Sequence, residues 1–210
     1  MFKKLLSKLK FARKDEKREF LKKIFNFVKQ NKVEGAYCEF GVYKGGTFIE
    51  AWKIAQAKGL KMDFWAFDSF EGLPSDEGTF KKGGWSFGMK EFVGNLLKAG
   101  VPVEFDTVKV IRGFFKESLK GFSGFPIAIA YIDSDLYESA VEVLEFLTPR
   151  IQDGTVLVFD DFYFHKGNPE RGEQGALKEW LEKNPDIKVS EYQKYFWNGN
   201  SFIIHKNEQK

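Results

Sequence analysis

The chain has 210 residues, of which 43% are hydrophobic and 30% charged. These proportions are ordinary for one soluble α/β domain that buries its own core. The single cysteine, Cys38, argues against a disulfide framework and favours the reducing cytoplasm as the location, with Cys38 packed in a buried strand. No run approaches the roughly 18 apolar residues that cross a bilayer. We expect the N-terminal segment to be retained, because it lacks the pattern of a secretory signal.

The net charge of +3 is unevenly distributed. Residues 1–32 contain 12 Lys and Arg against 3 Asp and Glu, whereas residues 33–210 contain 21 against 27. The mildly acidic body argues against a nucleic-acid groove. We predict a basic helical arm, 1–32, and one domain, 33–210; weak contact of the arm with an anionic membrane surface is an alternative to a solvated helical face. The apolar residues expected to pack the arm on the domain are Leu5, Leu6, Leu9, Phe20, Leu21, Ile24 and Val28.

Hydrophobic periodicity and turn residues predict two N-terminal helices and then alternating strands and helices. The expected helices are 2–11, 15–31, 47–58, 89–99, 137–147 and 173–183, and the expected strands are 36–40, 63–67, 107–111, 126–132, 155–159, 187–192 and 201–205. This alternation indicates an α/β fold with a mostly parallel sheet covered on both faces, and the last two strands could form an antiparallel edge. The long irregular segment 69–87 is of the kind that is usually functional or mobile.

The first predicted strand ends in a glycine-rich turn, 39–47. Its glycines let the backbone approach a ligand, and the following helix presents free N–H groups. The spacing matches neither a dinucleotide fingerprint nor a P-loop. Glu39, just before the first glycine, favours a ligand that carries an amine over a pyrophosphate. A purely structural strand-to-helix turn is the alternative.

Aspartates follow three further predicted strands. Asp68 is placed to accept hydrogen bonds from a ribose diol, or else it caps its own turn. Asp133, Asp135, Asp160 and Asp161 follow two neighbouring strands, so four carboxylates converge there. Unpaired, they would repel one another, and a hard divalent cation resolves this conflict. Asp133, Asp160 and Asp161 make a plausible metal site, unless Asp135 only caps a helix and Asp161 is exposed.

Other residues carry weaker signals. His165 follows the aspartate pair and could act as a base or line the pocket, whereas His205 is expected to be structural or exposed. Trp85, Phe87 and Tyr163 could form a wall of a substrate pocket. The chain contains 24 phenylalanines, so most of its aromatic residues must lie in the core.

In this order the motifs resemble the macrocin O-methyltransferase family, metal-dependent enzymes that use S-adenosylmethionine to methylate sugar hydroxyls. The matching segments are 39–47 (EFGVYKGGT), 67–74 (FDSFEGLP), 112–114 (RGF), 132–139 (IDSDLYES) and 153–161 (DGTVLVFDD). The resemblance implies a class I methyltransferase (Rossmann-like) fold, a three-layer sandwich with a seven-stranded sheet and a reversed last strand. The sequence departs from the family at Gln174, where an arginine is expected at a helix start.

The resemblance also implies roles for individual residues. S-adenosylmethionine would be held by Glu39, Gly41, Val42, Gly45, Thr47, Asp68, Ser69, Gly113, Phe114 and Asp133. Asp133, Asp160 and Asp161 would bind Mg²⁺, and Asp135 would be the catalytic base. The expected acceptor is a small molecule or glycan with neighbouring hydroxyls that chelate the metal, whose charge lowers the hydroxyl pKa. The acceptor and the oligomeric state stay open.

Four alternatives remain at this stage. A catechol-type O-methyltransferase also uses aspartates after these strands. A haloacid-dehalogenase-like phosphatase would use Asp133 and Asp135, but it requires Thr or Val where Tyr137 stands. A glycosyltransferase with a metal-binding Asp-x-Asp motif would leave the Glu39–Gly41 turn unexplained. A binding module without catalysis is disfavoured, because buried carboxylates cost stability without a use.

Overall fold

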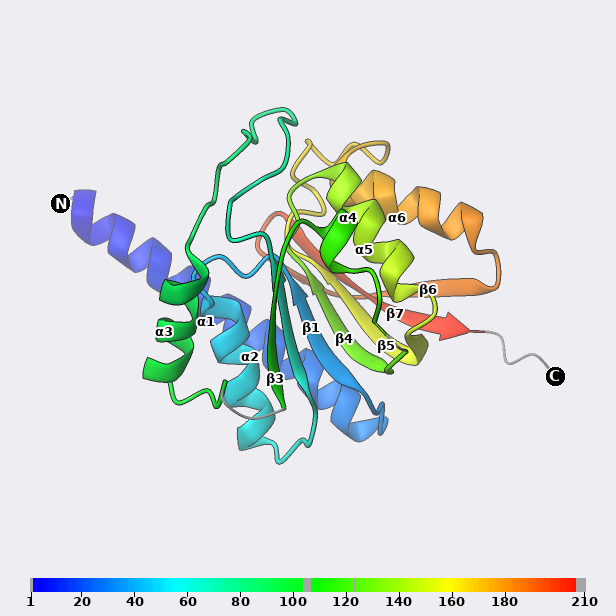
Figure 1. The fold of residues 1–210 in the computed structure, drawn as a ribbon, viewed down its shortest axis with the longest axis horizontal. Helices are drawn as coiled ribbons and strands as arrows, with labels where there is room; N and C mark the ends of the chain where they lie inside the picture. The colour runs from blue at the N-terminus through cyan, green and yellow to red at the C-terminus, as the bar shows by residue number, and fades with distance from the viewer. Residues whose placement is uncertain (1, 104–106, 123, 207–210) are drawn as a thin grey trace.

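The computed structural model describes the backbone of residues 2–103, 107–122 and 124–206, and the side chains in these ranges from Asp15 onward. Figure 1 shows the chain as a sheet between two groups of helices. The elements in chain order are α1 (Phe2–Gln30), β1 (Ala36–Phe40), α2 (Gly46–Ala57), β2 (Phe64–Asp68), α3 (Met89–Lys98), β3 (Val108–Arg112), α4 (Phe115–Ser118), β4 (Ile127–Ile132), α5 (Tyr137–Leu147), β5 (Ile151–Phe159), α6 (Gly172–Lys183), β6 (Ile187–Tyr195) and β7 (Gly199–Lys206).

The described strands form one sheet of seven, in the order β3-β2-β1-β4-β5-β7-β6. The first five strands in the sequence pair in parallel, and β7 runs antiparallel to both β5 and β6. The predicted mostly parallel sheet with a reversed last strand is therefore confirmed. Because β4 pairs with β1, the strand order reverses beside β1, and ligands bind at such a reversal in open α/β sheets.

Three expectations about the elements were wrong in detail. The two N-terminal helices are one helix, α1, since neither proline nor glycine interrupts residues 2–30. Strand β5 starts at Ile151, four residues before the expected 155. The short helix α4 was missed, because four residues cannot display a helical period.

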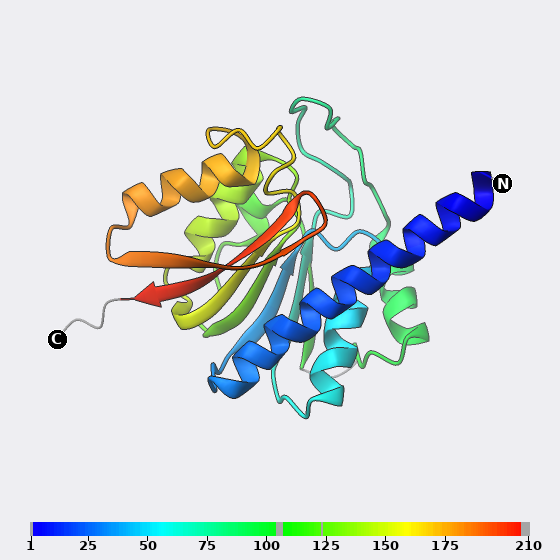
Figure 2. The same cartoon turned by 180° about the vertical axis from the view of Figure 1, so that it is seen from behind.

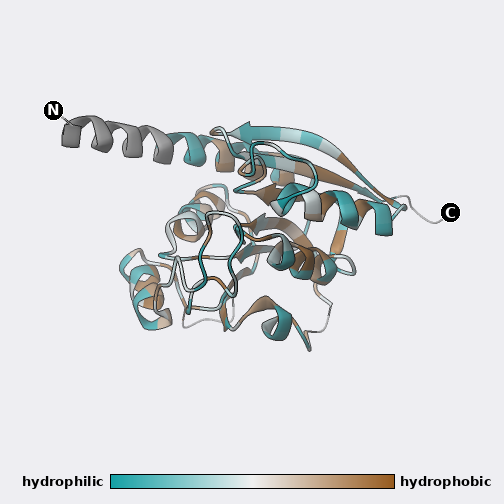
Figure 3. Cartoon of the chain, turned by 90° about the horizontal axis from the view of Figure 1, so that it is seen from above, coloured by the Kyte–Doolittle hydropathy of each residue, from teal (hydrophilic) through white to brown (hydrophobic). Residues whose placement is uncertain are grey.

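The helices form the outer two layers of the sandwich. Helices α1, α2 and α3 cover one face of the sheet, and α4, α5 and α6 cover the other (Figures 1 and 2). Seen from above in Figure 3, brown apolar segments of the sheet lie between the helical layers. Alternate residues of β1 contribute to the two cores, Tyr37 to one and Cys38 to the other, which is why apolar residues occur on both faces of this strand.

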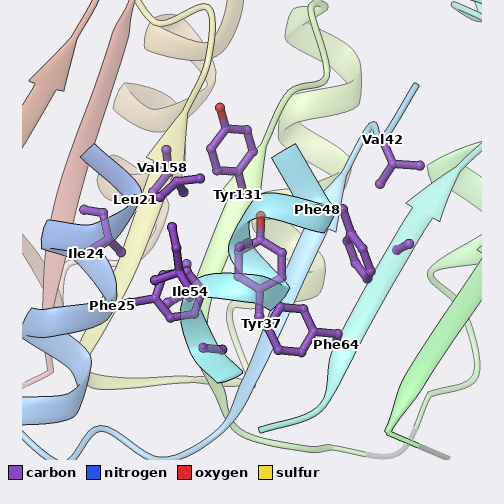
Figure 4. Packing of buried hydrophobic residues seen from close by; sticks show 14 of the residues in the cluster. Leu21, Ile24, Phe25, Tyr37, Val42, Phe48, Ile54, Phe64, Tyr131 and Val158 are labelled. Atoms are coloured by element: carbon purple, nitrogen blue, oxygen red, sulfur yellow. The ribbon is translucent and has the colours of Figure 1, made fainter. Parts of the chain in front are cut away.

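The second half of α1 is part of the first of these cores. Leu21, Ile24 and Phe25 are completely buried, and Figure 4 shows them beside the side chains of the central strands. Phe20 and Val28 are buried as well, so the predicted apolar packing of the arm is confirmed for this part. Outside the described side chains lie Leu5, Leu6 and Leu9.

The segment between β2 and α3 extends beyond the carboxyl ends of the strands (Figure 1). It folds back on itself through paired backbone hydrogen bonds between Glu77 and Phe80 and through two bonds between Leu73 and the Gly83–Gly84 turn. In the part of the chain that the structure describes, no helix is both long enough and apolar enough to cross a bilayer.

Candidate active site

A cavity of about 1370 Å³ lies at the carboxyl ends of the parallel strands. Its walls come from the turns that follow β1 to β5, from the β2–α3 segment, from α5, from the β6–β7 turn and from Lys17 of α1. The predicted cofactor contacts that line it are Glu39, Gly41, Val42, Thr47, Asp68, Ser69, Gly113, Phe114 and Asp133. Gly45 is not part of the lining. A β-carbon there would come within 2.9 Å of the Phe92 ring, so this glycine serves the packing of the turn on α3.

The first turn brings β1 against the end of β4. Gly41 has a φ of +88°, and a β-carbon on it would lie 2.0 Å from the carbonyl oxygen of Asp133. A glycine is therefore required at this position, whatever ligand binds there. Glu39, two residues before Gly41, is buried and accepts a 2.5 Å hydrogen bond from the Tyr37 hydroxyl. Burial raises the pKa of Glu39 to about 8.

Asp68 joins the first turn to the second. Its Oδ2 accepts hydrogen bonds from the backbone N–H groups of Val42 (2.8 Å) and Tyr43 (3.1 Å), and its Oδ1 accepts one from Phe70 (2.7 Å). The bond to Phe70 is the capping role that the sequence left open. The carboxylate nevertheless lines the cavity, so its contact with a ribose stays a prediction.

Three carboxylates meet at the ends of β4 and β5. Oxygens of Asp133, Asp135 and Asp161 all lie within 4.8 Å of one another. Burial, followed by the charge of Asp160, raises the pKa of Asp133. Burial and the hydrogen bond with Asp161 raise the pKa of Asp135. A bound hard cation would let all three ionise, so the donor set fits a divalent metal.

Asp160 has different surroundings. Its Oδ1 forms a 2.7 Å ion pair with Lys17 and accepts hydrogen bonds from the hydroxyls of Tyr131 and Tyr195. The compact group of three therefore contains Asp135 in place of Asp160, which the sequence had placed in the metal site. The metal roles of Asp133, Asp160 and Asp161 stay predictions.

Several partners of the aspartates were not foreseen. The fully buried carboxylate of Glu173, at the start of α6, accepts hydrogen bonds from the backbone N–H groups of Ser134 (3.3 Å) and Asp161 (3.0 Å). The side-chain amide of Asn198 donates a 2.7 Å hydrogen bond to Asp161. Lys17 comes from the opposite end of the chain. In the sequence, a glutamate beside glycines at a helix start is a weak indication that Glu173 has a functional role. No local sequence pattern marks Asn198 or Lys17.

The weaker predictions have mixed outcomes. Trp85 lines the cavity and is 61% exposed, whereas Phe87 and Tyr163 lie outside the lining. His165 is also outside it. Its ring lies 3.2 Å from the carboxylate of Glu77, and this contact holds the β2–α3 segment against the β5–α6 connection. His205 lies on β7 and is exposed, as expected.

The sequence of residues 14–171, more than half of the chain, matches the family model of macrocin-O-methyltransferase (TylF). The chain belongs to the macrocin-O-methyltransferase family. This membership confirms the resemblance seen in the motifs. It favours a methyltransferase over the phosphatase and glycosyltransferase alternatives, whose motifs are only partly present.

Two similar proteins come from Streptomyces. The 8-demethyl-8-(2,3-dimethoxy-alpha-L-rhamnosyl)-tetracenomycin-C 4'-O-methyltransferase of Streptomyces olivaceus is 32% identical over 143 residues, covering 62% of this chain and 54% of that protein. The demethyldecarbamoylnovobiocin O-methyltransferase of Streptomyces niveus is 28% identical over 142 residues, covering 63% and 54%. The chain thus spans about half the length of the curated relatives it matches.

Solved structures share the fold. The O-methyltransferase NovP superposes with a TM-score of 0.75 at 22% identity, covering 90% of this chain and 79% of that one. The calicheamicin methyltransferase CalS11 has a TM-score of 0.68 at 16% identity, covering 89% and 77%. These likenesses confirm the class I methyltransferase fold, a Rossmann-like sheet with a reversed strand.

Proposed function

We propose that this protein is a metal-dependent O-methyltransferase that transfers a methyl group from S-adenosylmethionine to a hydroxyl of a sugar or glycosylated metabolite. One observation carries the proposal. The same cavity is lined by the Glu39 and Asp68 turns and by the carboxylate group of Asp133, Asp135 and Asp161. A methyl donor and a metal-bound acceptor could therefore meet within one pocket.

The size and lining of the cavity support two ligands. Small-ligand pockets usually measure about 300–1,000 Å³, and this one is larger, at about 1370 Å³. Buried Glu39 would pair with the amino group of the methionine end, and Asp68 would accept hydrogen bonds from the ribose. The exposed rings of Trp85 and Trp197 line the same cavity and offer apolar surface to an acceptor.

The carboxylate group would serve the acceptor. When bound there, a divalent cation would polarise the acceptor hydroxyl and favour its ionisation. Asp135 has two oxygens, so it can face the cation with one and receive the acceptor proton with the other. Its hydrogen-bond contact with Asp161 keeps it within the group. The remaining contribution of the protein is orientation, which can supply about 7–11 kcal/mol of a barrier.

The relatives support the class of acceptor. The tetracenomycin enzyme has a rhamnosyl group in its name, and another structure of CalS11 is described as a TDP-rhamnose 3'-O-methyltransferase. Neighbouring hydroxyls of a deoxysugar can chelate a metal in the way the site requires. A catechol presents the same pair of oxygens, so catechols belong in the acceptor screen beside rhamnosides and TDP-rhamnose.

The first test is calorimetric titration of the purified protein with S-adenosylhomocysteine, with and without Mg²⁺. Asp68→Ala should weaken binding by about 10–100-fold, the usual loss for a charged hydrogen bond. Asp186→Ala is the matched control, because Asp186 is exposed in the α6–β6 turn. It should bind like the wild type. Failure of the wild-type chain to bind S-adenosylhomocysteine under either condition would contradict the proposal.

A further inference from the structure

Glu77 joins the β2–α3 segment to two other parts of the protein. Its Oε2 accepts a 2.8 Å hydrogen bond from the backbone N–H of Tyr137, the first residue of α5 and 60 positions away in the sequence. Its Oε1 lies 3.2 Å from Nε2 of His165, in the β5–α6 connection. One carboxylate therefore connects three segments that are distant in the chain.

The contact with Tyr137 supplies what the start of α5 lacks. The first N–H groups of a helix have no partner within the helix, and the positive end of the helix dipole favours a negative charge. The residue before the helix, Leu136, makes no capping hydrogen bond with its side chain. Glu77 provides the acceptor and the charge instead. Only 21% of its side chain is exposed, so water competes weakly for the contact.

His165 is packed where it meets Glu77, and only 10% of its side chain is exposed. Gly172 has a φ of +56°, and a β-carbon there would lie 2.6 Å from the histidine ring, so a glycine makes room for the ring. Gly78, beside Glu77, lies close to the same ring, since a β-carbon on it would be 3.5 Å from Cε1 of His165. The ring is thus held between the β2–α3 segment and the start of α6.

Three aromatic rings form one wall of the cavity beside this contact. Phe80 of the β2–α3 segment lies 4.6 Å from Phe164 of the β5–α6 connection, measured between ring centres. Phe164 lies 5.9 Å from Trp197 of the β6–β7 turn. All three residues line the cavity, and we call them the aromatic wall. Trp197 precedes Asn198, which bonds to Asp161, so the wall lies at the end of the cavity assigned above to the acceptor.

The wall depends on where the β2–α3 segment is held. The backbone hydrogen bonds between Glu77 and Phe80, and those between Leu73 and the Gly83–Gly84 turn, close within the segment and do not attach it to the sheet. Phe80, which is buried, follows Glu77 by three residues. Release of Glu77 would therefore let Phe80 move away from Phe164 while the segment keeps its own turns.

We propose that Glu77 is a positioning residue that holds the aromatic wall in place, and that this wall selects acceptors with an apolar face. The inference rests on the proposed function, because it names what the acceptor end of that cavity recognises. A 6-deoxysugar presents C–H groups and a methyl group that pack on aromatic rings, while its hydroxyls stay available for the reaction. An acceptor with a charge on that face would lose hydration without gaining a partner.

The first test measures how often the segment leaves the wall. Trypsin cleaves after Lys81 and Lys82, which are exposed near the end of the segment, and its rate follows the population of the open chain. Glu77→Gln has one acceptor oxygen in place of two, so cleavage should be about 10–100-fold faster. Glu71→Gln is the matched control, because Glu71 forms an exposed pair with Arg112 from the same segment and should contribute little. Equal rates in the two variants would overturn the inference.

A second pair of variants isolates the contact with α5. Leu136 has φ −107° and ψ 145°, which suits the residue before a proline, and proline is tolerated at the first position of a helix. Tyr137→Pro removes the N–H that Glu77 binds, whereas Tyr137→Ala keeps it, and both variants lose the contact of the tyrosine hydroxyl with Glu179. Cleavage should be about tenfold faster in the proline variant than in the alanine variant. Equal cleavage would overturn the role of this contact.

The third test measures the acceptor. Binding of p-nitrophenyl α-L-rhamnopyranoside, in the presence of saturating S-adenosylhomocysteine, is followed by saturation-transfer difference NMR. Glu77→Gln and Trp197→Ala should each weaken it by about 2–10-fold, as expected for the loss of aromatic contacts, with S-adenosylhomocysteine affinity unchanged. Leu97→Ala is the control, since Leu97 is an exposed apolar residue of α3 outside the cavity lining. A merely structural role of Glu77 would weaken both ligands alike.

The outcomes separate this inference from the proposed function. If the wild-type chain does not bind S-adenosylhomocysteine, the proposed function fails and the inference falls with it. If it binds S-adenosylhomocysteine but not the rhamnoside, the methyl donor site stands and the selection of a deoxysugar by the wall is overturned. Faster cleavage of Glu77→Gln with unchanged rhamnoside affinity would likewise overturn the link between the wall and the acceptor.

Discussion

Glu39 shows how the surroundings of one residue can control both stability and binding. The folded chain raises its pKa from 4.5 to about 8, mainly through burial. The folded state therefore holds a proton that the unfolded state releases between these values. The contribution of Glu39 to the free energy of unfolding falls as the pH rises through this window. An ammonium group of a bound ligand would offset the unfavourable burial of charge by stabilising the ionised form of Glu39.

We therefore expect binding of S-adenosylhomocysteine to strengthen as the pH rises from 6 to 7.5, by up to about tenfold per pH unit below the pKa. Glu39→Gln should bind more weakly and lose this pH dependence, because it cannot ionise. Calorimetric titration at several pH values measures both effects. Glu34→Gln, an exposed change just before β1, should keep the wild-type profile. An unchanged profile in Glu39→Gln would show that the carboxylate does not face the ligand amine.

Asp135 is the second residue whose role can be tested alone. It adopts a φ of +61°, a left-handed conformation that is uncommon outside glycine, asparagine and aspartate. Asp135→Asn keeps the size of the side chain and tolerates the same left-handed backbone conformation, but it removes the carboxylate that would accept a proton. We expect turnover to fall by about 10²–10⁴-fold, with S-adenosylhomocysteine affinity retained. Near-normal turnover would remove Asp135 as the base, and Asp186→Asn serves as the control.

At the scale of elements, α6 connects the two aspartate-bearing turns. Glu173 on its first turn accepts backbone hydrogen bonds from Ser134, after β4, and from Asp161, after β5. Gly175 lets the start of the helix pack against the preceding loop, since the backbone of Glu170 lies only 2.7 Å from where a β-carbon on Gly175 would stand. The carboxylate thus links the two turns that carry the aspartates proposed to bind a metal.

Glu173→Gln keeps the side-chain volume but has one acceptor oxygen in place of two. One of the two backbone hydrogen bonds, from Ser134 or from Asp161, should therefore be lost. Hydrogen-bond partners of this kind typically change metal affinity by about 10–100-fold, and we expect Mn²⁺ binding to weaken to that extent. Thermal unfolding reports whether the fold survives. Glu182→Gln, exposed on the same helix, is the matched control. Equal Mn²⁺ affinity in the two variants would contradict a positioning role for Glu173.

At the scale of the whole molecule, one cavity is lined by residues from five strand ends, from α1 and from the β6–β7 turn. A ligand bound there contacts both halves of the sheet and should stabilise the entire fold. At a concentration of 100 times its dissociation constant, a ligand adds about 2.7 kcal/mol to the free energy of unfolding. For a chain of this size that corresponds to a rise in melting temperature of about 5–10 °C.

Differential scanning fluorimetry with S-adenosylhomocysteine checks this expectation. Adenosine alone, which lacks the methionine end that Glu39 would bind, should produce a smaller shift at the same concentration. Equal shifts for the two compounds would argue that the glycine-rich turn does not recognise the methionine end. The comparison therefore tests whether the Glu39 turn contributes to binding in addition to Asp68.

Much of this architecture is determined by local sequence. The apolar runs of β1, β2 and β4 predicted a sheet buried on both faces, and the residues that end each run predicted where a ligand would bind. Strand ends and the turns after them are contiguous in the chain, so their chemistry can be read directly. For this reason nine of the ten predicted cofactor contacts line the cavity, while the tenth, Gly45, serves packing.

Only the tertiary structure decided how the aspartates are partnered. Lys17 and Asp160 are 143 positions apart, and Asn198 lies 37 positions from Asp161. No periodicity records such contacts, because they arise when α1 and the β6–β7 turn close over the same end of the sheet. The sequence by itself determined that carboxylates would gather there. Which carboxylate pairs with Lys17, and which one bonds to Asn198, depends on side chains that folding brings from distant parts of the chain.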